Sequence, residues 1–216
     1  MTITMATTRD TYEAAMRPAG AARSTAHRAF ALLAFLLTTM TTLIAGRSTL
    51  GAAEGADVIG TRPPAWQAED WQNSAPLTLA ELKGKVVLVR WWTAPECPHC
   101  AATAPSLNTL YQESSEKGLV VIGMYHHKSP TPLDEKEVVA HVKRLGFLFP
   151  VAIDRDWTTL KRWWLDTGDR SWTSVSFLID RHGIIRHVHT GGRYEKDSAD
   201  YRVMKAKVEE LLGEKG

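Results

Sequence analysis

Short runs of β-branched and apolar residues alternate with amphipathic segments from residue 86 onward, and this alternation limits the possible folds more than any other feature. Buried strands are expected over residues 86–92, 119–125, 150–154 and 175–179, with a paired strand over 184–190. Helical spacing and terminating glycines predict helices over 100–117, 134–146, 158–164 and 199–212. Strands that alternate with helices and end in a hairpin indicate an α/β fold, with a central mixed β-sheet flanked by helices.

The two cysteines of the chain, Cys97 and Cys100, are separated by only two residues. A bridge across so short a loop stabilises little, because the gain from a structural disulfide grows with loop length. The pair is therefore expected to carry chemistry. Since Cys97 follows the strand over 86–92 and Cys100 opens a helix, the free N–H groups and the dipole of that helix would stabilise a thiolate. We expect Cys97 to be the nucleophile and Cys100 the resolving cysteine.

The residues beside the cysteines are candidates for tuning their reactivity. Pro98 and His99 lie between them, and a cationic His99 would favour the Cys97 thiolate. Glu96 precedes Cys97 and would oppose that thiolate. These opposing charges are expected to set the redox poise of the pair.

A zinc site is the rival interpretation of two cysteines at this spacing. Zinc needs about four ligands, usually completed by a second cysteine pair or by histidines, and the sequence has no further cysteine. His126 and His127, at the end of the strand over 119–125, are weak candidates for metal ligands. The ligand count disfavours zinc but leaves this interpretation open.

The N-terminal third of the chain differs in character from the rest. A polar, basic lead over residues 1–28 is followed by an apolar run over 29–45, a Gly/Ala-rich linker over 46–62 and a globular domain over 63–216. This order is typical of a secretory signal peptide, and the apolar run is also borderline for an uncleaved membrane anchor. Either alternative exports the domain, by inference to the periplasm, where disulfides persist.

The charge balance bears on the partners of the chain. The formal net charge is only +2, with 26 basic and 24 acidic residues. A nucleic-acid-binding domain would have a more basic surface, so no nucleic-acid partner is expected.

The cysteine pair and its surroundings resemble the TlpA/ResA branch of the thioredoxin-like superfamily, which is related to the redoxins. The matching features are the segment 82–89, Trp92 with the Cys-Pro-His-Cys motif, Pro105, and the segment 177–185 with its Asp-x-x-Gly turn. A helix and strand at about 134–154 resemble the αβ insertion of that branch. The resemblance covers about residues 60–213. It implies a thioredoxin-like fold with a TlpA-type αβ insertion.

The same resemblance implies an activity. It indicates a thiol–disulfide oxidoreductase that exchanges disulfides with protein thiols and with a redox partner of unknown identity. No cofactor is expected beyond the redox-active Cys97–Cys100 disulfide. By the same resemblance, Trp92, Trp172, Thr173 and Ser174 are expected to face the substrate, with core packing as the alternative for Trp172.

Three features depart from the family pattern. Ser174 occupies the position where the family has a cis-proline, which orders the substrate backbone and keeps metals from the thiols. Arg90 replaces an acidic or amide residue; near the thiols it would favour a thiolate, whereas it could also extend to the surface. Four residues rather than three separate Trp92 from Cys97, so the active-site loop is expected to be remodelled.

Two other functions remain open at this point. A copper-binding module or metallochaperone resembling the Sco type would use Cys97, Cys100 and a nearby histidine, although that family separates its cysteines by three residues. A peroxidase of the peroxiredoxin class would need a Thr-x-x-Cys signature. Here Thr93 lies four positions before Cys97, which disfavours the peroxidase.

Overall fold

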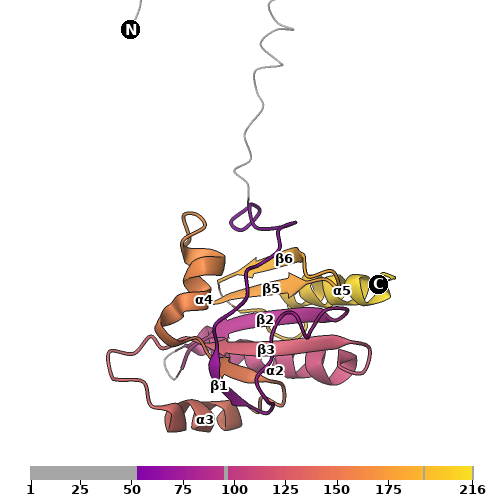
Figure 1. Ribbon diagram of the computed structural model, residues 1–216. Coiled ribbons are helices and arrows are strands. Elements are labelled where there is room, and N and C mark those ends of the chain that lie inside the picture. The colour runs from indigo at the N-terminus through magenta and orange to yellow at the C-terminus, as the bar shows by residue number, and fades with distance from the viewer. Residues whose placement is uncertain (1–52, 95–96, 192, 216) are drawn as a thin grey trace, which may run out of the picture. The chain divides into compact units, whose positions relative to one another are not determined.

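Six strands form a mixed sheet in the computed structural model, which describes residues 53–94, 97–191 and 193–215. In chain order the strands are β1 (Glu69–Gln72), β2 (Val86–Trp92), β3 (Leu119–Tyr125), β4 (Val151–Ile153), β5 (Val175–Ile179) and β6 (Ile185–Thr190). They lie in the order β1-β4-β3-β2-β5-β6 (Figure 1). Since β2, β3 and β4 run parallel while the other pairs are antiparallel, the predicted mixed sheet is confirmed.

The strand β2 lies inside the sheet, and its sequence explains why. All seven of its residues are buried. Val86 and Leu88 point into the core on one face of the sheet, whereas Val87 and Val89 point into the core on the other. A parallel strand that is covered on both faces needs apolar side chains in both directions.

Three helices contribute to the core on one face of the sheet. They are α2 (Pro98–Ser114), α3 (Glu135–Arg144) and α5 (Ala199–Gly213), and each begins and ends within three residues of its predicted bounds. Leu107 of α2, Val138 of α3 and Val208 of α5 are buried together in this core. The face of the sheet that carries Val86 and Leu88 is thus the one that receives α2.

The opposite face is packed with aromatic rings. The 3₁₀ helix η1 (Arg155–Trp157), the helix α4 (Thr158–Leu160) and the π-helix η2 (Lys161–Leu165) lie here. Trp163 of η2 packs against Trp91 of β2 and Phe177 of β5, with ring centroids 5.3 Å and 5.6 Å apart. Tryptophan side chains therefore make up much of the core on this face of the sheet.

A linker was predicted over 46–62, but its described part, residues 53–62, packs against the domain. Val58 is buried there, and the Gly60 amide donates to the Ile185 carbonyl (2.8 Å). The Ile185 amide in turn donates to the Thr61 carbonyl (2.9 Å). These bonds and the burial of Val58 make residues 53–62 part of the folded domain, which begins before residue 63.

The predicted lead over 1–28 and apolar run over 29–45 lie outside the described residues, as do residues 46–52. Within the described ranges, no helix combines the length and the apolar character that crossing a bilayer requires.

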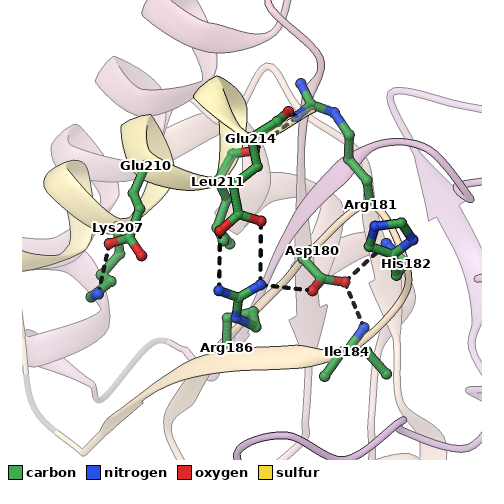
Figure 2. A network of polar contacts seen from close by, with 9 residues as sticks. All are labelled: Asp180, Arg181, His182, Ile184, Arg186, Lys207, Glu210, Leu211 and Glu214. Carbon is green, nitrogen blue, oxygen red and sulfur yellow. Dashed lines mark hydrogen bonds and ion pairs between the residues drawn. The ribbon is translucent and has the colours of Figure 1, made fainter. Parts of the chain in front are cut away.

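The turn between β5 and β6 is tied to the end of α5 by charged groups (Figure 2). Arg186 donates through Nη1 to Asp180 Oδ2 (3.1 Å) and through Nη2 to Glu214 Oε1 (3.0 Å). Asp180 Oδ1 also accepts from the backbone amides of His182 and Ile184, each at 2.9 Å. The predicted Asp-x-x-Gly turn is therefore closed by its own aspartate.

Candidate active site

Cys97 and Cys100 form a disulfide at the start of α2, with their Cα atoms 5.3 Å apart. Cys97 is the N-cap residue, and its Sγ accepts a hydrogen bond from the Cys100 amide (3.1 Å). Pro98 takes the first helical position, where a missing N–H costs no helical hydrogen bond. Because the first turn of α2 carries no acidic side chain, its partial positive charge is available to a Cys97 thiolate.

The two sulfur-bearing residues differ in their access to solvent. Cys97 is half-buried and lines a surface cleft. Cys100 is only 3% exposed and packs in the core beneath it. An incoming sulfur atom can therefore approach Cys97 from the cleft, whereas Cys100 is shielded.

The cleft beside Cys97 has a volume of about 540 Å³. Its walls come from the end of β2 with the start of α2, from the loop after β3, and from the loop before β5. The lining residues are Thr93, Cys97, Pro98, His99, Lys128, Ser129, Pro130, Ser171, Trp172, Thr173 and Ser174. The carboxyl ends of parallel β2 and β3 thus open into it, which is the usual place for a binding site in such sheets.

Three residues predicted to face the substrate, Trp172, Thr173 and Ser174, line this cleft. The Oγ atom of Ser174 lies 3.6 Å from the Sγ atom of Cys100. Trp172 is 47% exposed, which is unusual for so large an apolar side chain. This loop therefore offers both an apolar surface and a hydroxyl group next to the disulfide.

Trp172 is fixed by contacts with Trp164 and Gly191. Its backbone carbonyl accepts a hydrogen bond from Trp164 Nε1 (2.7 Å). Its ring lies so close to Gly191 that a Cβ at that position would come within 2.5 Å of it. Gly191 also has a positive φ of 64°, a conformation that favours glycine.

Trp92, which was expected to face the substrate, lies elsewhere. It is 1% exposed and packs edge-on against Tyr125 and Phe147, with ring centroids 5.0 Å and 5.3 Å apart. The prediction for Trp92 is wrong because side chains alternate along β2, and this position points into the core that receives α2.

Arg90 does not extend to the surface, so that alternative is also wrong. Its side chain is completely buried, and Nη1 donates to Ser176 Oγ (3.4 Å) and to the Gly191 carbonyl (3.3 Å). The guanidinium carbon lies 5.7 Å from the ring centre of Tyr194. Burial lowers the pKa of Arg90. The arginine thus links β2, β5 and the loop that supports Trp172.

The two histidines after β3 have different surroundings. His126 is buried, packs edge-on against Trp157, and has its pKa lowered to about 3, first by burial and then by the charges of Lys128 and Arg90. His127 contacts the Tyr125 hydroxyl and the Thr131 carbonyl. Among the described residues, no group of three or more His, Cys, Asp or Glu side chains is placed to hold a metal ion.

Of the two charged residues beside the cysteines that were predicted to tune them, only His99 belongs to the described residues. His99 lines the cleft, whereas Glu96 lies outside the described residues. The sequence interpretation overlooked the loop wall formed by Lys128, Ser129 and Pro130. Its position directly after a strand parallel to β2 was the signal that could have revealed it.

Comparison with known proteins adds independent information. Residues 59–204 match the family model described as Redoxin. The chain is 30% identical over 167 residues to Protein DipZ of Mycobacterium tuberculosis, which covers 76% of this chain and 22% of that protein. It is 28% identical over 161 residues to the thiol-disulfide oxidoreductase ResA of Bacillus subtilis, covering 74% and 78% respectively. The chain thus spans about a fifth of the DipZ proteins it matches.

Solved structures share the fold. A putative thiol:disulfide interchange protein DsbE from Chlorobium tepidum superposes with a TM-score of 0.58 at 22% identity, covering 72% of this chain and 98% of that one. A thiol-disulfide isomerase from Corynebacterium glutamicum gives 0.58 at 24% identity, with the same coverage. The predicted thioredoxin-like fold is therefore confirmed.

Proposed function

The chain belongs to the Redoxin family, and from that membership we propose that it is an extracytoplasmic thiol–disulfide oxidoreductase that exchanges disulfides with protein thiols through Cys97 and Cys100. The observation that carries the proposal is the unequal placement of the two sulfurs. Cys97 lines the cleft at the N-terminus of α2, whereas its partner Cys100 is buried behind it. A nucleophile and a shielded resolving cysteine are the two parts that such an exchange needs.

In the oxidising direction, a substrate thiolate attacks Cys97 Sγ from the cleft. A bond forms between the substrate sulfur and Cys97, the Cys97–Cys100 bond breaks, and its electron pair remains on Cys100 Sγ. A second substrate thiolate then attacks the substrate sulfur of this mixed disulfide and releases Cys97 as a thiolate. The substrate gains a disulfide, and the protein is left with two reduced cysteines, which a redox partner of unknown identity reoxidises.

The reducing direction follows the same path backwards. The helix N-terminus prepares the attacking group for its first step, because it keeps Cys97 as the thiolate that attacks a substrate disulfide. Stabilisation of that thiolate also stabilises the reduced protein, which makes the disulfide a stronger oxidant. The cell's redox partner therefore decides the net direction.

Trapping of the mixed disulfide tests the proposal. In Cys100→Ser the resolving sulfur is absent, so substrate proteins should remain linked to Cys97 and should be released by a reducing agent. The matched control is Cys97→Ser, which retains only the buried sulfur and should trap little or nothing. Equal trapping by both variants, or none by either, would contradict the proposed exchange.

The extracytoplasmic location is supported by the basic lead over 1–28 and the apolar run over 29–45. It is tested by fusing a reporter that is active only after export to the end of this N-terminal segment. The fusion should be active, and deletion of residues 29–45 should abolish its activity. Equal activity of both fusions would contradict the location.

A further inference from the structure

The contact between Cys100 and Ser174 joins the buried sulfur to a hydroxyl from another part of the chain. The two side-chain atoms, Sγ and Oγ, lie 3.6 Å apart, within the range for a hydrogen bond that involves sulfur. Ser174 immediately precedes β5, is half-buried and lines the cleft. The hydroxyl thus lies next to an atom that gains charge during disulfide exchange.

The chemistry of the exchange leaves that charge in an unfavourable place. When a substrate thiolate bonds to Cys97, the electron pair of the broken bond remains on Cys100 Sγ. Cys100 is only 3% exposed, so water solvates the developing thiolate poorly. Burial of a charge is costly unless a hydrogen-bond donor compensates for the lost solvent.

We propose that the Ser174 hydroxyl is a catalytic group that donates a hydrogen bond to the Cys100 sulfur as the disulfide opens. The inference rests on the proposed thiol–disulfide exchange and adds a residue to its mechanism. Ser174 keeps its proton throughout, and the thiolate of Cys100 later takes a proton from solvent or attacks the mixed disulfide again. A hydroxyl group is suited to this role because it donates without carrying a charge of its own.

The position of Ser174 is well defined by its neighbours. Trp172, two residues before it, is anchored through its carbonyl to Trp164 Nε1, and the following Val175 is completely buried in β5. The backbone that carries the hydroxyl is therefore held in place before the reaction begins, and a donor that is positioned in advance is effective in catalysis.

Other charged or titratable groups act on the same region. His99 of α2 and Lys128 of the loop after β3 line the cleft. Arg90 of β2 and His189 of β6 lie opposite Ser176 in the sheet. The pKa of His189 is lowered to about 4, first by burial and then by the charge of Arg90. All four remain in place when only Ser174 is replaced, so a comparison of Ser174 variants isolates the hydroxyl.

The first test measures the buried thiol directly. In Cys97→Ala the disulfide is absent, and the pKa of Cys100 can be followed by thiolate absorbance in the ultraviolet. Addition of Ser174→Ala should raise that pKa by about one unit, the effect of one hydrogen bond to a charged group. Ser174→Thr, which keeps the hydroxyl, should restore the lower value. Equal pKa values with and without the hydroxyl would overturn the inference.

The second test measures the rate at which a small thiol opens the Cys97–Cys100 disulfide. Ser174→Ala should slow this step about tenfold, whereas Ser174→Thr should remain close to the parent protein. Ser176→Ala is the matched folding control, because it removes a buried hydroxyl two residues further on, in β5. That hydroxyl contacts Arg90 and Tyr194 rather than sulfur.

The two tests separate the inference from the proposed function. A disulfide that no thiol can open would contradict the proposed function, while the pKa comparison would still decide the role of Ser174. A parent protein that exchanges readily, together with an equally fast Ser174→Ala variant, would overturn the role of Ser174 alone.

Discussion

Asp57 and Arg170 form an ion pair that joins the N-terminal segment to the loop before β5, with 3.0 Å between Arg170 Nη1 and Asp57 Oδ1. The Arg170 guanidinium also lies 4.1 Å from the ring centre of Trp164. Next to it, the Ser171 amide donates to Glu54 Oε1 (2.8 Å). Residues 54–57 therefore support the wall of the cleft that carries Trp172 and Ser174.

Replacement of Asp57 by Asn should loosen this wall. Because the Asp57 side chain is 48% exposed, the loss in unfolding free energy should be below about 1 kcal/mol. Amide hydrogen exchange over residues 170–174 should nevertheless become faster, since the loop loses the ion pair. Glu210→Gln, which breaks the exposed pair with Lys207 on α5, is the control and should leave that exchange unchanged. Unchanged exchange in Asp57→Asn would mean that the ion pair does not support the loop.

Trp172 is the largest side chain that lines the cleft and is 47% exposed, so Trp172→Ala should weaken the binding of a cysteine-containing peptide. We expect its KM to rise about tenfold, which corresponds to the loss of one well-packed aromatic contact. The KM for a small-molecule thiol should rise less, because such a thiol needs to reach only Cys97. Val203→Ala on α5 removes a similarly exposed apolar side chain away from the cleft and serves as the control. An equal rise in KM for the peptide and for the small thiol would argue against a binding role of Trp172.

The strands and helices that are set by neighbouring residues in the chain were predicted well from the sequence. The runs that became β2 and β3 are apolar in both directions, and glycines 118 and 146 limit the helices that precede them. The strand β1 was not predicted, because Glu69–Gln72 is short and polar and pairs at the edge of the sheet with β4, far along the chain. Edge strands of this kind carry no apolar alternation.

The site was predicted less completely, because it too depends on contacts between segments that are far apart in the chain. Cys97, Cys100 and the loop 172–174 could be recognised from motifs, but the orientation of each side chain depends on contacts between distant segments. Trp92 turned out to be buried because α2 and Phe147 pack on its face of the sheet. Arg90 is held by Ser176 and by Gly191, a residue 101 positions away, which no local pattern reveals.

The carboxylate of Asp180 should make the stability of the protein sensitive to acid (Figure 2). Burial raises the pKa of Asp180, but the hydrogen bonds from the Ile184 and His182 amides and from Arg186 outweigh it, so that the pKa is lowered from 3.8. The stabilisation is therefore complete above pH 3.8 and is lost as the pH falls through the lower, folded-state pKa. At neutral pH, Asp180→Asn should cost about 1–3 kcal/mol of unfolding free energy.

Chemical denaturation at a series of pH values measures this effect. The difference in unfolding free energy between the parent protein and Asp180→Asn should shrink as the pH falls below 3.8. A difference that stays constant with pH would show that the charge of Asp180 is not involved.

His126 should contribute to acid sensitivity over a higher range of pH. Its pKa falls from 6.5 to about 3 in the folded protein, chiefly through burial, so between these values the unfolded chain binds a proton that the folded protein does not. Stability is therefore expected to decrease as the pH falls from 6.5 towards 3. This group alone should contribute a slope of about 1.4 kcal/mol per pH unit.

His126→Phe, which retains an aromatic ring against Trp157, should remove that part of the slope. His187 and His189 also have lowered pKa values, but they are present in both proteins, so the difference between the two slopes reports on His126. Identical slopes for the two proteins would contradict the burial of a neutral imidazole at this position.

Cys97 and Cys100 should form a working redox couple, which a redox titration can establish. The protein is equilibrated with glutathione buffers of graded potential, and the two thiols are counted by alkylation and mass spectrometry. We predict a single two-electron transition in which both thiols appear together, at a potential between roughly −120 and −270 mV, the span of known thiol–disulfide oxidoreductases. A potential below about −300 mV, as found for structural disulfides, together with an absence of exchange with thiols, would show that the pair is not a redox-active couple.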